Sequence, residues 1–300
     1  MQDKIIEWNN YHLDILSSDK PKCITKIGST EAVHIAEYIK TNGQNCIFNS
    51  HDLNMACGIY RSSLESHKKW CEAYINGIKT SDYLHLSHEI HFKRNENTQK
   101  RILNQHTDTF IYNSLKDHMN LSHIPESCVH HSIYSFLLKE KSWHYNLQDK
   151  KVLVVSSSQK TFEHQAERFS NIWPGAKLGG FEFVKIPSSE YLTHDDQSNQ
   201  IEWSDKVENA KNEIRKKDFD FAMLGCGGIG LILVDFIKNE IGKSCTYLGG
   251  SLQLYFGIRG GRWENLKNDW YNANEFWTKP FQEDIPKNYK INEGGCYWVQ

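Results

Sequence analysis

Short apolar runs alternate with helical patterns along the second half of the chain. Residues 151–155 contain an unbroken run of β-branched and other apolar residues, which is typical of a buried strand. Residues 181–186, 219–224 and 244–248 are predicted as three further strands. Between them lie polar loops and segments in which apolar residues recur at helical spacing. Strands that alternate with helices predict an α/β fold: a mostly parallel, Rossmann-like sheet with helices on both faces.

The first half of the chain carries fewer strand patterns and is predicted to be rich in helices. Residues 23–27 are predicted as a short strand, and a helical pattern follows at once. A second helical stripe covers residues 62–79, and residues 82–86 resemble a short strand. We place a boundary near Leu147. It separates an N-terminal α/β part (1–147) from a Rossmann-like half with a wrapping C-terminal tail (148–300), unless both form one compact domain.

Composition narrows the classes of function. The chain has 300 residues and a formal net charge of −2, so no overall basic field is present and nucleic acid is not an expected partner. No window approaches the roughly 18 apolar residues of a membrane span, so no integral membrane segment is expected. The eight cysteines are scattered without a C-x-x-C pair, which is typical of reduced thiols and favours a cytoplasmic protein.

The glycine-rich stretch after residues 219–224 is the strongest motif. Gly225, Gly227 and Gly230 satisfy the pattern G-x-G-x-x-G, Gly228 adds a fourth glycine, and an apolar helical pattern follows. Such a loop allows backbone N–H groups to face a phosphate. A dinucleotide site also needs an acid at the end of the next strand, and none stands there. NAD is therefore not expected. The loop is interpreted either as part of a phosphate- or nucleotide-sugar-binding site or as a tight turn without a ligand.

A second pair of loops contains candidate phosphate-binding groups. Gly250 and Ser251 follow the last predicted strand. Arg259 and Arg262 lie among glycines, where the backbone can approach a ligand closely, and a planar guanidinium group suits a diphosphate. The alternative is that both arginines pair with acidic side chains at the surface.

The loop after residues 151–155 offers a hydroxyl and an ammonium group. Ser158 and Lys160 stand where the carboxyl end of a strand meets a helix, and there they could contact a phosphate or a sugar. The alternative is an ordinary solvated loop. No Cys/His spacing resembles a zinc site, and neither a G-x-S-x-G elbow nor a Walker A pattern occurs.

The turn from Lys26 to Glu31 has the same strand-to-helix position in the first half. Gly28 and Ser29 begin the turn, and the Glu31 carboxylate falls in the first turn of the helix. An acid at this place is also common as a capping-box residue that stabilises a helix start, which is the alternative to a functional role.

This turn resembles the motif region of GT-D type glycosyltransferases, in which a strand enters an Arg-x-Gly-Asp-Gly-Glu-like turn. Residues 219–250 are similar to the Rossmann-like C-terminal half of that group, and 256–263 and 295–298 resemble its final loops. The likeness implies that the Asp-x-Glu pair is linked to the nucleotide-sugar and to Mg²⁺ or Mn²⁺. Here Ser29 replaces the first acid and Lys26 replaces the usual arginine. A single carboxylate holds these cations more weakly than a pair, so metal dependence is in doubt.

The resemblance implies a glycosyltransferase of bacterial or viral polysaccharide synthesis. Its donor would be a nucleotide-sugar, with a UDP-sugar as the first expectation, and its acceptor a glycan or a lipid-linked sugar. Glu31 would act as catalytic base, as hydroxyl acceptor or as metal ligand. Lys26, Arg259 or Arg262 would neutralise the leaving diphosphate. The alternatives are an NAD(P)-dependent oxidoreductase acting on a sugar nucleotide and a non-catalytic nucleotide-sugar-binding protein.

Overall fold

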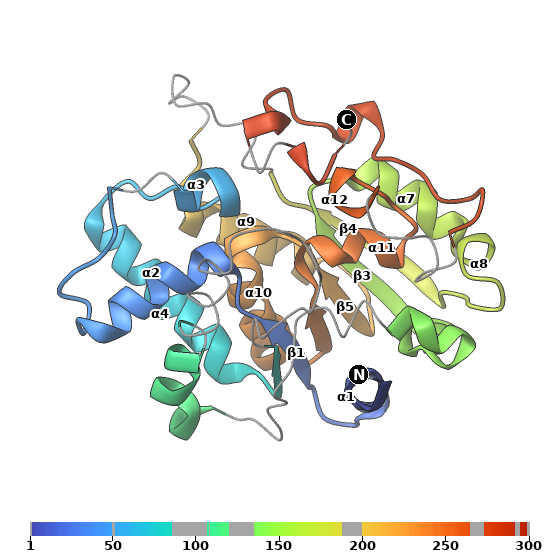
Figure 1. Cartoon of the computed structure of the whole chain (residues 1–300), viewed down its shortest axis with the longest axis horizontal. Coiled ribbons are helices and arrows are strands. Elements are labelled where there is room, and N and C mark those ends of the chain that lie inside the picture. Colours follow the sequence, from blue (N-terminus) through green and yellow to red (C-terminus); the bar gives the residue numbers. More distant parts are fainter. Residues whose placement is uncertain are drawn as a thin grey trace.

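A single six-stranded sheet forms the centre of the described structure (Figure 1). The computed structural model describes residues 2–49, 52–85, 107, 109–119, 135–187, 200–264, 273–291 and 295–298. Within them every strand pairing is parallel, and the strand order is β2–β1–β6–β5–β3–β4. The predicted α/β, Rossmann-like class is confirmed. The strands are β1 (Cys23–Lys26), β2 (Tyr83–His85), β3 (Lys151–Ser156), β4 (Gly180–Lys185), β5 (Phe221–Leu224) and β6 (Ser244–Tyr247).

Helices connect the strands and follow the last one. The α-helices in the described ranges are α1 (Gln2–Ser17), α2 (Ser29–Lys40), α3 (Asp52–Cys57), α4 (Leu64–Thr80), α7 (Gln159–Glu167), α8 (Phe169–Ile172), α9 (Trp203–Arg215), α10 (Gly230–Phe236), α11 (Leu252–Tyr255) and α12 (Gly261–Glu264). A π-helical turn, Ile237–Ile241, extends α10. None of the described helices is both long and apolar enough to cross a membrane.

The two faces of the sheet belong to two separate hydrophobic clusters, as β3 demonstrates. Its Leu153 and Val155 pack with residues of α2, α4, α9 and α10. Its Val152 and Val154 pack on the other face with residues of α1, α7, α8 and α11. Because successive side chains of a strand point to opposite faces, an unbroken apolar strand must be covered on both. The predicted placement of helices on both faces is confirmed.

The N-terminal strands belong to the same sheet as the later ones. Cys23 of β1 is in register with Cys245 of β6, and β1 pairs on its other edge with β2. The boundary placed near Leu147 therefore falls between segments whose strands form one continuous sheet. The described C-terminal residues contain mainly short helical turns and one isolated bridge between Ile258 and Thr278.

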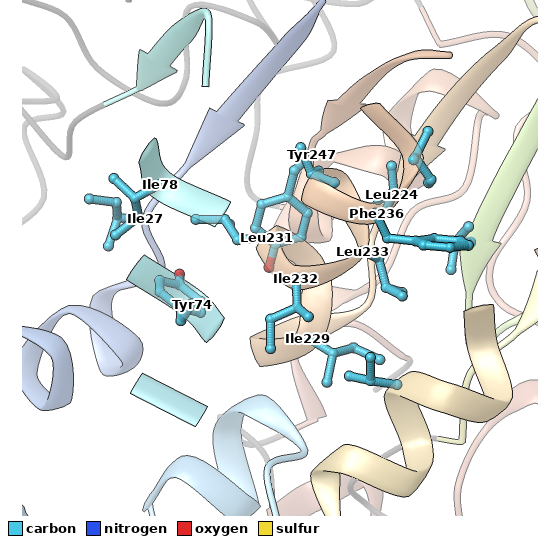
Figure 2. Packing of buried hydrophobic residues seen from close by; sticks show 14 of the residues in the cluster. Ile27, Tyr74, Ile78, Leu224, Ile229, Leu231, Ile232, Leu233, Phe236 and Tyr247 are labelled. Atoms are coloured by element: carbon cyan, nitrogen blue, oxygen red, sulfur yellow. The ribbon is translucent and has the colours of Figure 1, made fainter. Parts of the chain in front are cut away.

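Helices α4 and α10 pack closely because a glycine lies at their contact. Figure 2 shows Tyr74 and Ile78 of α4 on the side of α10 that carries Leu231, while Phe236 points the other way. A Cβ atom at Gly77 of α4 would overlap the backbone carbonyl of Leu231. Since backbone cannot move aside as a flexible side chain can, only glycine fits at this position.

We expect Gly77→Ala to lower the free energy of unfolding by about 1–3 kcal/mol through overpacking, although alanine is the better helix former. Lys69→Ala in the exposed part of α4 is the matched control and should change stability by less than about 0.5 kcal/mol. Urea unfolding of the full chain measures both. Unchanged or increased stability of Gly77→Ala would contradict the close α4–α10 contact.

Candidate functional site

The carboxyl ends of four adjacent strands are left open because the chain leaves them in alternating directions. The chain passes from β1 into α2 and from β5 into α10 on one face, and from β6 into α11 and from β3 into α7 on the other. Open α/β sheets bind ligands where connections diverge in this way. A cavity of about 240 Å³ lies at these strand ends.

The cavity brings together segments that are far apart in the sequence. Its lining includes eight of the sequence-predicted site residues: Lys26, Gly28, Ser29, Glu31, Ser158, Gly225, Gly227 and Gly250. The lining also includes residues that were not among the predicted site residues: Thr30, Cys57, Ser156, Ser157, Lys206, Cys226, Tyr247, Gln253, Tyr297 and Trp298. The described part of the chain therefore places both the early turn and the glycine loop at one site.

Other predicted site residues do not line this cavity: Lys160, Gly228, Gly230, Ser251 and Arg259. Lys160 is exposed on α7, and the Ser251 hydroxyl donates to the Leu248 carbonyl at 2.7 Å. The backbone amide of Arg259 donates to Thr278 at 2.8 Å. Arg262 belongs to α12, and its side chain lies outside the described part of the structure.

Glu31 places a buried carboxylate at the start of α2. Its side chain folds back over Gly28, where a Cβ atom would overlap the carboxylate, and Glu31 is 5% exposed. The Gly28 amide donates to the Tyr74 hydroxyl at 3.3 Å, so this amide has a partner other than a capping-box acid. Burial, followed by the Glu31 carboxylate, raises the pKa of the Cys57 thiol well above its usual range. The protonated thiol can therefore donate a hydrogen bond to Glu31.

Lys26 brings positive charge to the same edge. Its side chain runs along Gly249, where a Cβ atom would lie 2.5 Å from the Lys26 Cε atom. The Lys26 ammonium lies 5.2 Å from the centre of the Tyr247 ring, within the range of a cation–π contact. The Tyr247 hydroxyl donates to the Gly227 carbonyl at 2.9 Å. Burial, followed by the negative charge of Glu31, raises the pKa of Tyr247.

Lys206 is a second cationic residue of the cavity wall. It belongs to α9, is 4% exposed, and its ammonium donates to the Gly58 carbonyl at 2.6 Å. Burial raises the pKa of the Cys226 thiol to about 12, while the Lys206 charge acts in the opposite direction. The sequence carries a signal for this lysine: it lies three residues after the buried Trp203, on the apolar face of an otherwise charged helix.

The glycines of the 225–230 loop are enclosed by the protein itself. A Cβ atom at Gly227 would lie 2.5 Å from the Cys57 carbonyl oxygen, and one at Gly230 would overlap the Tyr247 ring. Gly228 is enclosed in the same way. In a dinucleotide site the second glycine makes room for the pyrophosphate, whereas here the end of α3 occupies that approach.

The start of α7 is also occupied by a group of the chain. The buried Asp284 carboxylate accepts hydrogen bonds from the amides of Lys160 at 3.3 Å and Thr161 at 2.7 Å, and from the Thr161 hydroxyl at 2.6 Å. An anion-binding helix N-terminus next to the cavity is thus satisfied internally. Ser158 lines the cavity, where its hydroxyl could contact a ligand as predicted. The Lys160 amide, by contrast, already donates to Asp284.

The cavity's donor set does not suit a divalent metal held by protein groups alone. Among the described lining residues Glu31 is the one carboxylate, and two lysines share the wall with it. Mg²⁺ prefers oxygen ligands in a regular octahedron, and cationic neighbours oppose its binding. The described residues also contain no group of three or more His, Cys, Asp or Glu side chains suited to a metal ion.

Comparison of the chain with protein-family models, with curated proteins and with solved structures finds no match. The likeness to GT-D glycosyltransferases therefore rests on short sequence motifs alone. A function must be inferred from the chemistry of the residues that line the cavity.

Asp284→Ala should lower the free energy of unfolding by about 3 kcal/mol, because it leaves the two α7 amides and the Thr161 hydroxyl without their buried acceptor. Glu283→Ala, at an exposed neighbouring position, is the control and should be close to neutral. Equal stability of both variants in urea unfolding would show that Asp284 does not hold the start of α7.

Proposed function

We propose that the protein is a glycosyltransferase that takes its sugar from a nucleotide-sugar bound at the carboxyl edge of the sheet. One observation carries the proposal: a buried carboxylate, Glu31, and two lysines, Lys26 and Lys206, line the same cavity. Transfer from such a donor needs positive charge at the leaving diphosphate and a proton acceptor near the attacking hydroxyl group. The likeness of the turn from Lys26 to Glu31 to the GT-D motif supports the same assignment.

The proposed roles follow from charge and position. Lys26 and Lys206 stabilise the diphosphate as it leaves, an electrostatic task that requires preorganised cations. The acceptor hydroxyl oxygen forms a bond to the anomeric carbon, and the bond from that carbon to the diphosphate breaks. The electron pair of the broken bond leaves with the diphosphate, and Glu31 takes the hydroxyl proton. Cys57, as a neutral thiol beside Glu31, orients the carboxylate.

The alternative of a dinucleotide-dependent oxidoreductase is less well supported by the geometry. The carbonyl of Cys57 lies where the pyrophosphate would approach Gly227, and β6 is followed by Leu248 and two glycines in place of an acid. A non-catalytic nucleotide-sugar-binding protein would use the same cavity, and activity assays separate it from a transferase.

The donor class is tested by calorimetry with UDP-, GDP-, CMP- and dTDP-sugars. We expect at least one of them to bind with a dissociation constant below about 1 mM, because charge-assisted hydrogen bonds from two lysines act on its phosphate groups. NADH serves as the competing ligand and should not bind. Binding of NADH together with no binding of any nucleotide-sugar would reject the proposal in favour of the oxidoreductase.

Glu31→Gln should lower kcat for transfer, or for slow donor hydrolysis, by roughly 100-fold or more, because it removes the proton acceptor while keeping its shape. Donor affinity and melting temperature should stay near those of the parent. Glu37→Gln on the same helix is the control, since Glu37 does not line the cavity. Full activity of Glu31→Gln would reject Glu31 as the base.

Lys206→Met should weaken donor binding roughly tenfold through the loss of one cation at the diphosphate. The exposed Lys216, which follows α9, provides the matched control Lys216→Met with the same change in net charge. Calorimetric titration with the donor measures both. An equal effect of the two substitutions would show that overall charge, and not the cavity, determines affinity.

A further inference from the structure

Two aromatic residues near the C-terminus form part of the cavity wall. Tyr297 and Trp298 line it, although they lie almost fifty residues beyond Gly250 in the sequence. Their backbone is fixed to the body of the protein: the Gln253 side-chain amide donates to the Tyr297 carbonyl at 3.0 Å, and the Gly261 amide donates to the Trp298 carbonyl at 2.8 Å. This part of the wall is therefore preformed.

Two glycines make room for Tyr297. A Cβ atom at Gly250 would overlap the edge of the Tyr297 ring, and one at Gly260 would overlap its carbonyl group. The ring is thus placed directly on the loop that follows β6, one residue from Gly249, along which Lys26 runs. An aromatic ring and an ammonium group consequently border the same short loop.

The lining changes in character across the sheet. Lys26 and Glu31 follow β1, whereas Ile186 and Pro187 follow β4 on the far side of the cavity, and Phe162 of α7 lies with them in the wall. A pocket with one charged and one apolar region suits a ligand that is anionic at one end and apolar at the other. Nucleoside diphosphates have this division between phosphates and base.

Trp298 adds a buried hydrogen-bond donor to the cavity wall. Its indole is 4% exposed, and the Nε1–H group has no acceptor among the described residues. Buried donors are nearly always paired, and an unpaired one calls for an explanation. A nucleobase offers both a flat face for stacking and ring or carbonyl acceptors for such a donor, which a plain apolar group would not.

We infer that Tyr297 and Trp298 form the nucleobase subsite of the cavity, in which the base stacks on the Tyr297 ring while the phosphates lie toward the lysines. The inference rests on the proposed function, because it specifies how the same cavity would hold a nucleoside diphosphate. It assigns donor recognition to the last described segment of the chain, 295–298.

The test compares a ligand that has a base with one that lacks it. Calorimetric titrations use UDP, GDP, CMP and dTDP against inorganic pyrophosphate, with the full chain, Tyr297→Ala and Tyr297→Phe. Tyr297→Ala should weaken the best-bound nucleotide roughly tenfold and leave pyrophosphate within about twofold, because a stacked base loses its partner and the phosphates do not. Tyr297→Phe keeps the ring and should bind as the parent does. Melting temperatures verify that each variant is folded.

The outcomes distinguish failure of the nucleobase subsite from failure of the proposed function. If a nucleotide binds the parent and Tyr297→Ala leaves the ratio of nucleotide to pyrophosphate affinity unchanged, the subsite is rejected and the donor pocket stands. If no nucleotide binds the parent, both are rejected. A Trp298→Phe variant that loses nucleotide affinity but keeps pyrophosphate affinity supports the role of the indole N–H group.

Discussion

The structure depends on the direction in which the chain leaves each of four neighbouring strands. Connections from β1 and β5 pass to one face of the sheet, and those from β6 and β3 pass to the other. If all four turned to the same face, their helices would cover the strand ends. The alternation leaves the edge open, and the cavity lies there. Its wall combines segments 26–31, 56–58, 156–158, 225–227, 247–253 and 297–298, although each belongs to a different part of the sequence.

A buried carboxylate is costly for folding unless neighbouring groups stabilise its charge. Glu31 lies at the amino end of α2, where the helix dipole favours an anion, and it is next to the protonated Cys57 thiol. The negative charge of Glu31 also acts on Tyr247, and burial and this charge together raise the pKa of Tyr247. The cavity wall that contains this carboxylate also contains the cationic side chains of Lys26 and Lys206.

Much of the fold follows from local pattern, whereas much of the cavity does not. Unbroken apolar runs such as β3 require cover on both faces, so a parallel sheet could be predicted, and parallel strands place the turns at Gly28 and Gly225 on one edge. The pattern of apolar and polar residues does not reveal the order of the strands in the sheet. In the structure β1 lies beside β6. Helix α1 was not predicted, since polar residues such as Asn9 and His12 interrupt its buried face.

The glycine loop shows why a motif is ambiguous when it is read alone. Close approach by a ligand and close approach by another part of the chain require the same residue, and at Gly227 the neighbour is Cys57. In the same way, Asp284 satisfies a helix start that sequence alone would assign to phosphate. Lys206 and Tyr297 were not predicted as lining residues because their place in the cavity wall depends on tertiary contacts between distant segments.

We propose that the open edge of the sheet holds the phosphates of a nucleoside diphosphate. A crystal structure of the full chain with the best-bound nucleotide tests it most directly. We expect a diphosphate between the turn at Glu31 and the loop at Gly225, in contact with the ammonium groups of Lys26 and Lys206. A diphosphate bound at the surface away from these residues, with the cavity unchanged, would contradict it.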